Sequence, residues 1–320
     1  MLNKPYIPIV ELHFSNTCTG RCVICSDAHG YDSFPYCTED VFKHIITNLK
    51  TVDFGVIQVG GDGDSFLNPY FFEALRLLRK NFPDKPLTLF TNGFMLTPSN
   101  SDVIIKERLL DNVETRIDTI NPVLFKQSTG LDFNVVSNNI GYFMSKSADI
   151  KTHIIYFPLF IYEQCVREYL DKEPTDFYKI DKGLLKNEYL LVYTHFKSKV
   201  VKGPFNFRIS EICLWGERED AFINTETVCS QLNGAFKNQV YIYPNGNYGL
   251  CPFDDGQDTF VFGNVATDNL AEAYVGGKRK QYIQDITDMK YAGKGCCINP
   301  KACYSYDYYR NNVGVYSGIL

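Results

Sequence analysis

Three cysteines near the start of the chain have the types and spacing to bind a metal centre. Cys18, Cys22 and Cys25 form a Cys-x3-Cys-x2-Cys pattern. Thiolates are soft ligands that suit iron–sulfur clusters and zinc. Three of them can bind three irons of a cubane and leave the fourth iron open to chelate a small molecule, whereas a structural zinc site normally closes with four ligands. The pattern favours an open [4Fe–4S] site, with a zinc knuckle completed by Cys37 as the alternative.

Glycines and acidic or polar residues follow three later apolar runs of the chain. Gly60-Gly61-Asp62-Gly63-Asp64 comes after one run, Thr91-Asn92-Gly93 after the next, and Asp118 ends a third. Glycines let backbone groups approach a ligand closely. Taken alone, each segment is also a common turn, and Asp118 is equally suited to assist the start of the next helix.

These residues need strands and helices to position them. We expect strands at 10–15, 55–60, 87–91, 113–118, 152–157 and 189–196. The helices between them are expected to begin at Thr38, Asn68-Pro69, Ser101, Asn121-Pro122 and near residue 161. Strand–helix alternation predicts a parallel sheet covered by helices. Six such units predict an α/β fold with a partial (β/α)6 barrel, whose function sits at the carboxyl ends of the strands.

The sequence pattern changes after about residue 205, where cysteines become frequent and the motifs become hairpin-like. Residues 240–251 predict two strands joined by an Asn-Gly turn, and helices are expected near 267–274 and 277–288. Five further cysteines gather in this part of the chain: Cys229, Cys251, Cys296, Cys297 and Cys303. We therefore predict a barrel domain at 1–207 and a small α+β domain at 208–320.

Composition limits the classes of function. The 320 residues carry a net charge of −5 and show no obvious basic face, which argues against nucleic-acid binding. No apolar run approaches the ~20 residues that cross a bilayer, and the N-terminus has no secretion signal. We expect a cytoplasmic protein without a membrane partner, in which the eleven cysteines serve metal sites or catalysis rather than disulfides. His13, His153 and His195 are each suited to face the barrel interior, although a structural role is more common for a strand histidine.

The spacing of Cys18, Cys22 and Cys25 resembles the signature of the radical S-adenosylmethionine (SAM) superfamily. The resemblance implies a [4Fe–4S] cluster whose open iron binds SAM. Reductive cleavage of SAM then yields a 5′-deoxyadenosyl radical, which takes a hydrogen atom from the substrate. Ile24 is a mild departure, because relatives usually have an aromatic residue before the third cysteine.

The segments after the later strands resemble the same family in the same order. The Gly-Gly-acid segment is similar to a Gly-Gly-Glu-Pro motif that contacts the amino group of SAM, and Thr-Asn-Gly and the Asp at the end of the fourth strand also have counterparts. The resemblance implies these cofactor-binding residues: Gly60, Gly61, Asp62, Thr91, Asn92 and Asp118. Gly63 replaces the proline of the motif, and Asp62 is one methylene shorter than Glu.

The second cysteine group resembles the SPASM signature, or its shorter form, the twitch domain. Lys294 and Asp307 stand where the full pattern would have further cysteines. The resemblance therefore implies one auxiliary [4Fe–4S] cluster with four ligands: Cys229, Cys251, Cys297 and Cys303. Cys296 is the alternative to Cys297, and a structural zinc ribbon is the alternative to a cluster.

The resemblance implies an oxidoreductase that needs an electron donor such as flavodoxin or ferredoxin. A fully ligated auxiliary cluster suits acceptance of an electron, which favours a two-electron dehydrogenation of a small molecule such as a sugar or aminocyclitol. Only about a dozen residues precede the first expected strand, so we expect no N-terminal leader-peptide-binding domain. A peptide-modifying enzyme and a non-catalytic zinc or iron–sulfur protein are the alternatives.

Overall fold

The computed structural model describes residues 4–22, 35–61, 63–157, 182–200, 204–209, 238–250 and 260–287. Within them, nine strands form one sheet in the order β6-β5-β4-β3-β2-β1-β7-β8-β9. The strands are β1 (Tyr6–His13), β2 (Asp53–Gly60), β3 (Leu87–Thr91), β4 (Asn112–Ile117), β5 (Lys151–Tyr156), β6 (Phe205–Ile209), β7 (Gln239–Ile242), β8 (Asn247–Gly249) and β9 (Gly263–Asn264). The first seven are parallel, whereas β8 and β9 are antiparallel. The expected partial (β/α)6 barrel is confirmed, because six consecutive strands pair in chain order and in parallel.

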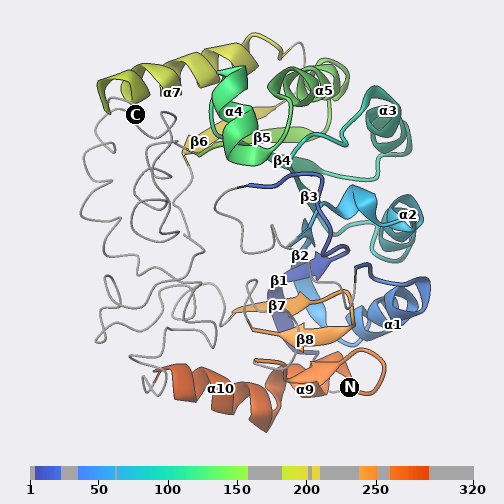
Figure 1. The fold of residues 1–320 in the computed structure, drawn as a ribbon. Coiled ribbons are helices and arrows are strands. Elements are labelled where there is room, and N and C mark those ends of the chain that lie inside the picture. The colour runs from blue at the N-terminus through green and yellow to red at the C-terminus, as the bar shows by residue number, and fades with distance from the viewer. Residues whose placement is uncertain are drawn as a thin grey trace.

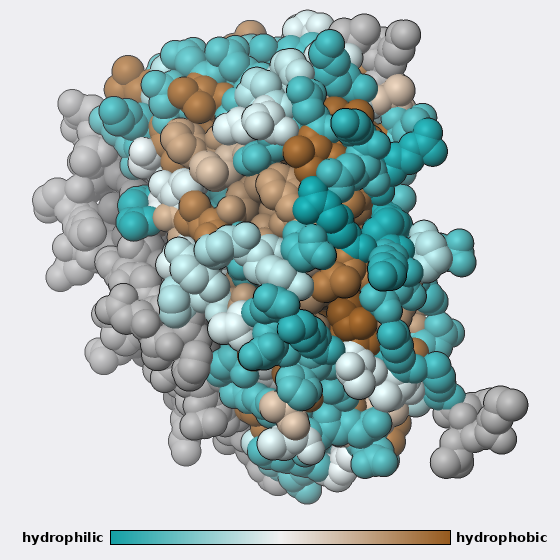
Figure 2. All heavy atoms as spheres, turned by 90° about the vertical axis from the view of Figure 1, so that its right-hand side faces the viewer, coloured by the Kyte–Doolittle hydropathy of each residue, from teal (hydrophilic) through white to brown (hydrophobic). Residues whose placement is uncertain are grey.

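Helices cover the outer side of this sheet (Figure 1). They are α1 (Glu39–Leu49), α2 (Phe71–Asn81), α3 (Pro98–Glu107), α4 (Pro122–Thr129), α5 (Phe133–Lys146), α7 (Lys182–Lys197), α9 (Leu270–Val275) and α10 (Gly277–Thr287), with a short 3-10 turn, η2 (Ser65–Leu67). Figure 2 faces the layer of α1, α2, α3 and α5, where hydrophilic residues surround smaller hydrophobic groups. Among the described helices, none combines the length and apolar character that crossing a bilayer requires.

The core lies between the sheet and this helix layer. On β1 the side chains alternate, so that Val10 and Leu12 are fully buried against the helices while Glu11 faces the opposite, concave side. Ile57 and Val59 continue the same buried row on β2. Side-chain caps begin the helices that follow, as when the Thr38 hydroxyl accepts a hydrogen bond from Val41 N at the start of α1.

One predicted strand is wrong. Residues 189–196 belong to helix α7, and the sixth strand is β6 at Phe205–Ile209. Val192 and Phe196 are fully buried and lie four residues apart, which places them on one face of a helix. Leu190 and Leu191 are about half exposed, so the apolar run is not buried on both sides as a central strand would be. The helix expected near 161–170 lies outside the described residues.

Two predicted helix starts are also wrong. Helix α2 begins at Phe71 rather than at Pro69. The Asn68 oxygen accepts from Tyr70 N at 2.8 Å, while the buried Asn68 amide nitrogen donates to the carbonyl groups of Phe14 and Cys37 at 2.9 and 2.8 Å. Helix α3 begins at Pro98, where Thr97 is the cap and Ser101 lies buried inside the helix. In both segments the residue identified as a cap makes a tertiary or backbone contact that the local pattern does not reveal.

The predicted hairpin and the two helices after it are confirmed, as β7 with β8 and as α9 and α10. The hairpin joins the main sheet, because β7 pairs in parallel with β1. β6 also crosses the boundary predicted between residues 207 and 208. The two-domain division stays a prediction, and the sheet shared by both parts gives them a common core.

Asn48 on α1 offers a test of how the later segment docks. Its buried amide donates to Val265 O and accepts from Leu270 N, both at 2.9 Å, so it satisfies the start of α9 from another part of the chain. Asn48→Ala leaves both backbone groups without this partner and should lower the free energy of unfolding by about 1–3 kcal/mol, measured by urea denaturation.

The exposed neighbour Thr47 supplies the control, because its hydroxyl bonds only within α1, to Lys43 O. Thr47→Ala should change the midpoint little. Equal effects of the two variants would contradict the proposed role of Asn48.

Candidate functional site

The predicted site residues that the structure describes lie at the carboxyl ends of β1, β2, β3 and β4. These strands are adjacent and parallel, so the loops that follow them leave the same edge of the sheet. The loop after β1 carries Cys18 and Cys22, Gly60 ends β2 and is followed by Gly61, and Asn92 follows β3. The Asn92 amide donates to Cys18 Sγ at 3.4 Å and to Thr19 Oγ1 at 3.0 Å. This contact directly joins two motifs that are 74 residues apart in the sequence.

Backbone and amide groups surround the two described cysteine sulfurs. Gly20 N donates to Cys18 Sγ at 3.3 Å. A Cβ built on Gly20 would lie 3.6 Å from Cys22 Sγ and 3.7 Å from Asn92 Nδ2, so the loop turns tightly between these groups. The Arg21 backbone N–H anchors the loop on Thr129 O, at the end of α4, at 2.7 Å.

The electrostatics of these thiols fit a bound metal centre. Burial raises the pKa of Cys18, and it raises the pKa of Cys22 to about 11 against the opposing effect of the Arg116 guanidinium. Buried thiolates need a cation to compensate for lost hydration. Iron supplies that charge, and N–H donors directed at sulfur, such as those of Gly20 and Asn92, are typical of iron–sulfur ligation. The described donor set therefore fits the cluster that the spacing predicts.

Several predicted ligands lie outside the described residues. They are Cys25, Asp62, Cys229, Cys251, Cys297, Cys303 and the alternative Cys296. Their roles stay predictions.

The glycines of the loop after β2 allow close backbone approach. A Cβ on Gly63 would overlap the carbonyl oxygens of Thr17 and Ser15 in the cysteine loop, and Asp64 N donates to Thr17 O at 2.8 Å. Gly61 has a φ of +104°, which a side chain would disfavour. The loops after β1 and β2 are thus packed directly on each other.

Asp64 is a site residue that the sequence reasoning did not assign a role. It is buried beside the cysteine loop, where Thr91 and Thr19 hydroxyl groups face it, and its carboxylate accepts from Phe66 N at 3.2 Å. Burial raises the pKa of Asp64 to about 6. Asp64 is the second acidic residue of the Gly-Gly-Asp-Gly-Asp segment, and this position was the sequence feature that could have identified it.

The Thr-Asn-Gly segment after β3 is held from two sides. Gly93 N donates to Thr91 Oγ1 at 3.2 Å, and Phe94 N donates to Asn92 Oδ1 at 2.9 Å. From α5, the Asn139 amide donates to Phe94 O at 2.7 Å. These bonds orient the Asn92 amide toward the cysteine loop.

Asp118 forms an ion pair at the end of β4. Arg116 donates to both of its carboxylate oxygens, at 2.7 and 3.0 Å, and lies over the Phe157 ring at 4.0 Å. Asp118 is fully buried, and burial raises its pKa. Asn121 caps helix α4, because its side chain accepts from Val123 N and Leu124 N. The ion pair lies next to Cys22, whose pKa responds to both charges.

Cys37 does not resemble a metal ligand. It is 2% exposed within the hydrophobic core, and burial raises the pKa of its thiol to about 12. Its Sγ contacts Thr38 O at 3.7 Å. The hydrophobic side chains packed around Cys37, in contrast to the N–H donors around Cys18, argue against the four-cysteine zinc knuckle with Cys37.

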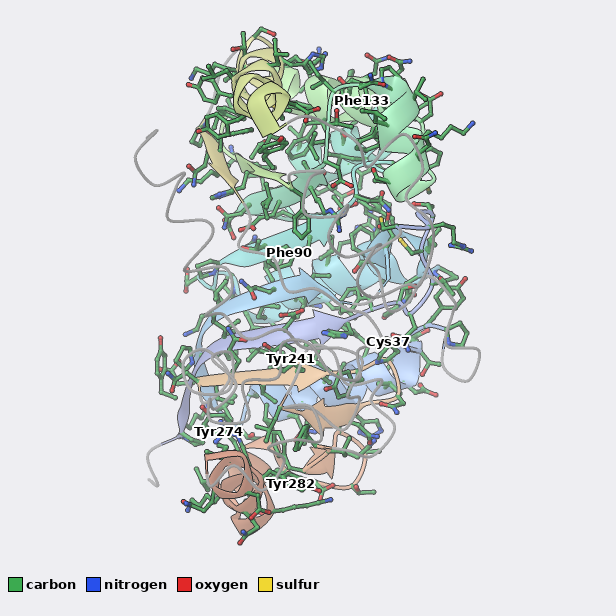
Figure 3. All side chains as sticks on the ribbon, turned by 60° about the vertical axis from the view of Figure 1, so that its left-hand side comes forward. Cys37, Phe90, Phe133, Tyr241, Tyr274 and Tyr282 are labelled. Atoms are coloured by element: carbon green, nitrogen blue, oxygen red, sulfur yellow. The ribbon has the colours of Figure 1, made fainter. Side chains whose placement is uncertain are left out.

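A row of polar residues crosses the concave face of the sheet. The register places Glu11, Gln58, Thr88 and Asn112 side by side across four strands. Phe90 and Tyr241 lie over the same face of the sheet in Figure 3. His153 is on β5, whereas His195 belongs to helix α7 and bonds Ser137 on α5 at 2.7 Å. Of the three histidines considered, His195 is thus not a strand residue.

Comparisons with known proteins agree with this arrangement. A model of the radical SAM superfamily matches residues 12–171, and a model of the SPASM iron–sulfur cluster-binding domain matches residues 229–304. No curated protein sequence matches the chain.

Solved structures with the same fold include three enzymes of low sequence identity. BtrN in complex with SAM and 2-DOIA is 13% identical, with a TM-score of 0.56, and the match covers 93% of this chain and 94% of BtrN. Native anSMEcpe with bound SAM is 16% identical, with a TM-score of 0.59 and coverage of 92% and 89%. Streptococcus suis SuiB bound to its precursor peptide SuiA is 15% identical, with a TM-score of 0.55 and coverage of 88% and 67%. At these identities the likeness shows the fold alone.

Cysteine replacements test the ligand assignment. Cys22→Ala should remove one cluster ligand and lower the iron bound after anaerobic reconstitution by about four atoms per chain, one cubane. Cys37→Ala removes only a core thiol and should leave the iron content unchanged. Chemical iron analysis of both variants would contradict the assignment if Cys37→Ala lost iron while Cys22→Ala retained it.

Proposed function

We propose that this chain, which belongs to the radical SAM superfamily and carries a SPASM iron–sulfur domain, is an oxidoreductase that dehydrogenates a small molecule. The contact of Asn92 with Cys18 carries the proposal, because it brings the cysteine loop and the Thr-Asn-Gly segment to one edge of the sheet. The cofactors are a [4Fe–4S] cluster with SAM in the first domain and auxiliary iron–sulfur chemistry in the second.

Cys18, Cys22 and Cys25 are the proposed ligands of the first cluster. Gly20 and Asn92 donate to sulfur and so stabilise the thiolate form of Cys18. The tight packing of the cysteine loop on Gly63 excludes water from this side. An open coordination position remains because only three thiolates are available in the motif.

The proposed SAM-binding residues flank these ligands. Gly60 and Gly61 present backbone groups, Asp62 supplies a carboxylate for the amino group of SAM, and Thr91 and Asn92 line the next strand end. Asp118 is proposed to complete the set from β4, held by Arg116. The order of these segments along adjacent parallel strands supports the assignment.

The second cysteine group is proposed to hold one auxiliary [4Fe–4S] cluster with Cys229, Cys251, Cys297 and Cys303, or Cys296 in place of Cys297. Cys18, Cys22 and Cys25 would hold a cluster that can supply one electron for cleavage of SAM to methionine and a 5′-deoxyadenosyl group. The second cysteine group would hold a cluster suited to accept the electron that a substrate loses on oxidation. A small electron-transfer protein such as flavodoxin or ferredoxin is the proposed donor.

The concave wall supports a small polar substrate. Glu11, Gln58 and Asn112 are partly exposed and lie in one row across the sheet with the buried Thr88, whose hydroxyl accepts from the Asn112 amide at 3.1 Å. Such groups suit the hydroxyl and amino groups of a sugar or aminocyclitol. BtrN was solved with SAM and 2-DOIA, whereas SuiB was solved with the peptide SuiA, so a peptide substrate is the alternative outcome of a substrate test.

Anaerobic reconstitution with iron and sulfide tests the proposed function. The wild-type protein should bind about eight iron atoms per chain, because each cubane holds four. Addition of dithionite and SAM should yield 5′-deoxyadenosine, quantified by chromatography, and Cys22→Ala should reduce its formation to background. Zinc bound by four thiolates, together with no affinity for SAM, would overturn the proposal.

Asp62 offers a second test. Asp62→Asn keeps the shape of the side chain but removes the charge that would bond the SAM amino group, and a charge-assisted hydrogen bond contributes about 1.5–3 kcal/mol. The dissociation constant of SAM for the reconstituted protein should therefore rise by roughly ten- to 150-fold. Asp84→Asn, an exposed substitution in the turn before β3, is the control and should leave the constant unchanged.

A further inference from the structure

His13 is a buried polar residue for which the proposed function has no role. It ends β1 on the concave side and is 1% exposed. Its Nε2 lies 3.2 Å from Glu11 Oε1 on the same face of the strand. The ring is packed edge-on against Tyr241, at 6.0 Å between centroids, and against Tyr243, at 5.3 Å. Both tyrosines come from β7 and its turn, in the region that leads to the second cysteine group.

The other side of the His13 ring contacts the proposed SAM-binding loop. The register of β1 and β2 places His13 beside Gly60. A Cβ on the next residue, Gly61, would overlap the His13 ring. Gly61 therefore lacks a side chain for two reasons, since its φ of +104° and the ring behind it both exclude one.

A second glycine repeats this arrangement on the tyrosine side. A Cβ on Gly249 in β8 would overlap the Tyr243 ring, which is itself 1% exposed. Gly249 precedes Cys251, a proposed auxiliary-cluster ligand, by two residues in the chain. The contacts Gly61–His13, His13–Tyr243 and Tyr243–Gly249 thus form one continuous packed row across β2, β1, β7 and β8.

We propose that His13 is a positioning residue, and that the row formed by Gly61, His13, Tyr243 and Gly249 couples the SAM-binding loop to the segment that enters the auxiliary-cluster region. The inference rests on the proposed function, in which Gly60 and Gly61 contact SAM. Close-packed rings transmit displacement because their surroundings contain little free volume. Glu11 and Tyr241 also contact the ring, which is 1% exposed, so movement of Gly61 should displace neighbouring side chains such as Tyr243 rather than solvent.

The row predicts reciprocal effects at its two ends. Loss of the His13 ring removes the support behind Gly61 and should weaken SAM binding. Loss of the Tyr243 ring should weaken it as well, although β1 lies between the strand before Tyr243 and the strand before Gly61. By linkage, SAM binding should in turn protect the β7–β8 segment.

The experiment measures SAM dissociation constants of the anaerobically reconstituted protein by equilibrium dialysis. His13→Ala and Tyr243→Ala should each raise the dissociation constant about tenfold relative to the wild type. The double variant should also show a rise of about tenfold and no more, because both changes break the same row. His13→Phe and Tyr243→Phe keep the rings and should stay within about threefold of the wild type.

Phe54→Leu is the matched control for lost core packing. Phe54 is 1% exposed but lies near the start of β2, at the opposite end of the strand from Gly60. It should lower thermal stability without changing the SAM constant. An equal rise in that constant for Phe54→Leu would show general loosening and overturn the proposal, as would wild-type binding by both alanine variants.

Hydrogen exchange of the wild-type protein adds a readout that requires no variant to fold. SAM should slow amide exchange in residues 239–250 as well as around Gly61. Protection confined to the loop after β2 would overturn the coupling while leaving the proposed function in place. Absence of SAM binding by the wild-type protein, or no effect of Asp62→Asn, would instead count against the proposed function.

Discussion

The parallel pairing of β1, β2, β3 and β4 is the constraint on which the site depends. Because the four strands run in one direction and in register, every loop that follows them emerges at the same edge of the sheet. The site residues are widely separated in the sequence, yet each follows shortly after the end of a strand: Cys18, Gly61, Asn92 and Asp118. The helix layer fixes that register by burying one row of each strand, since a slip of one residue would expose Val10 and Leu12 and bury Glu11.

The edge that this pairing creates is an unfavourable place for isolated charges. Burial raises the pKa values of Cys18, Cys22, Asp64 and Asp118 together, although the groups lie on different loops. Two guanidinium groups lie among them: Arg116 is already paired with Asp118, and Arg21 donates to the carbonyl groups of Cys18 and Gly20. A positively charged metal centre is the natural complement of such an environment. The same burial that disfavours free thiolates thereby favours a bound cluster and a dry setting for reactive chemistry.

In the described structure, the later part of the chain belongs to the same sheet as the barrel strands. β7 pairs with β1 on the side opposite β2, so a strand that carries site residues is held between the two parts of the chain. Asn48 and Thr51 on α1 also bond the start of α9. The segment that matches the SPASM model therefore shares a hydrophobic core with the barrel. Changes in packing at one end of β1 should affect both neighbouring strands, β2 and β7.

Local patterns were sufficient where chemistry and periodicity reside in adjacent residues. The cysteine spacing, the Gly-Gly-acid segment and the order of strands and helices all lie within short windows, so the family, the partial barrel and the hairpin at β7–β8 could be predicted. Residues 189–196 show the limit of that approach, because a short apolar run suits both a strand and a half-buried helix until its neighbours are known.

Tertiary structure alone decided which polar residues meet. The Asn68 amide donates to the carbonyl groups of Phe14 and Cys37, and Cys37 enters the core instead of a metal site. Asp64 and His13 became part of the site only through burial against other strands. The physical reason is that ligand types and turn residues are properties of local sequence, whereas burial and partner choice depend on contacts between segments that lie far apart in the chain.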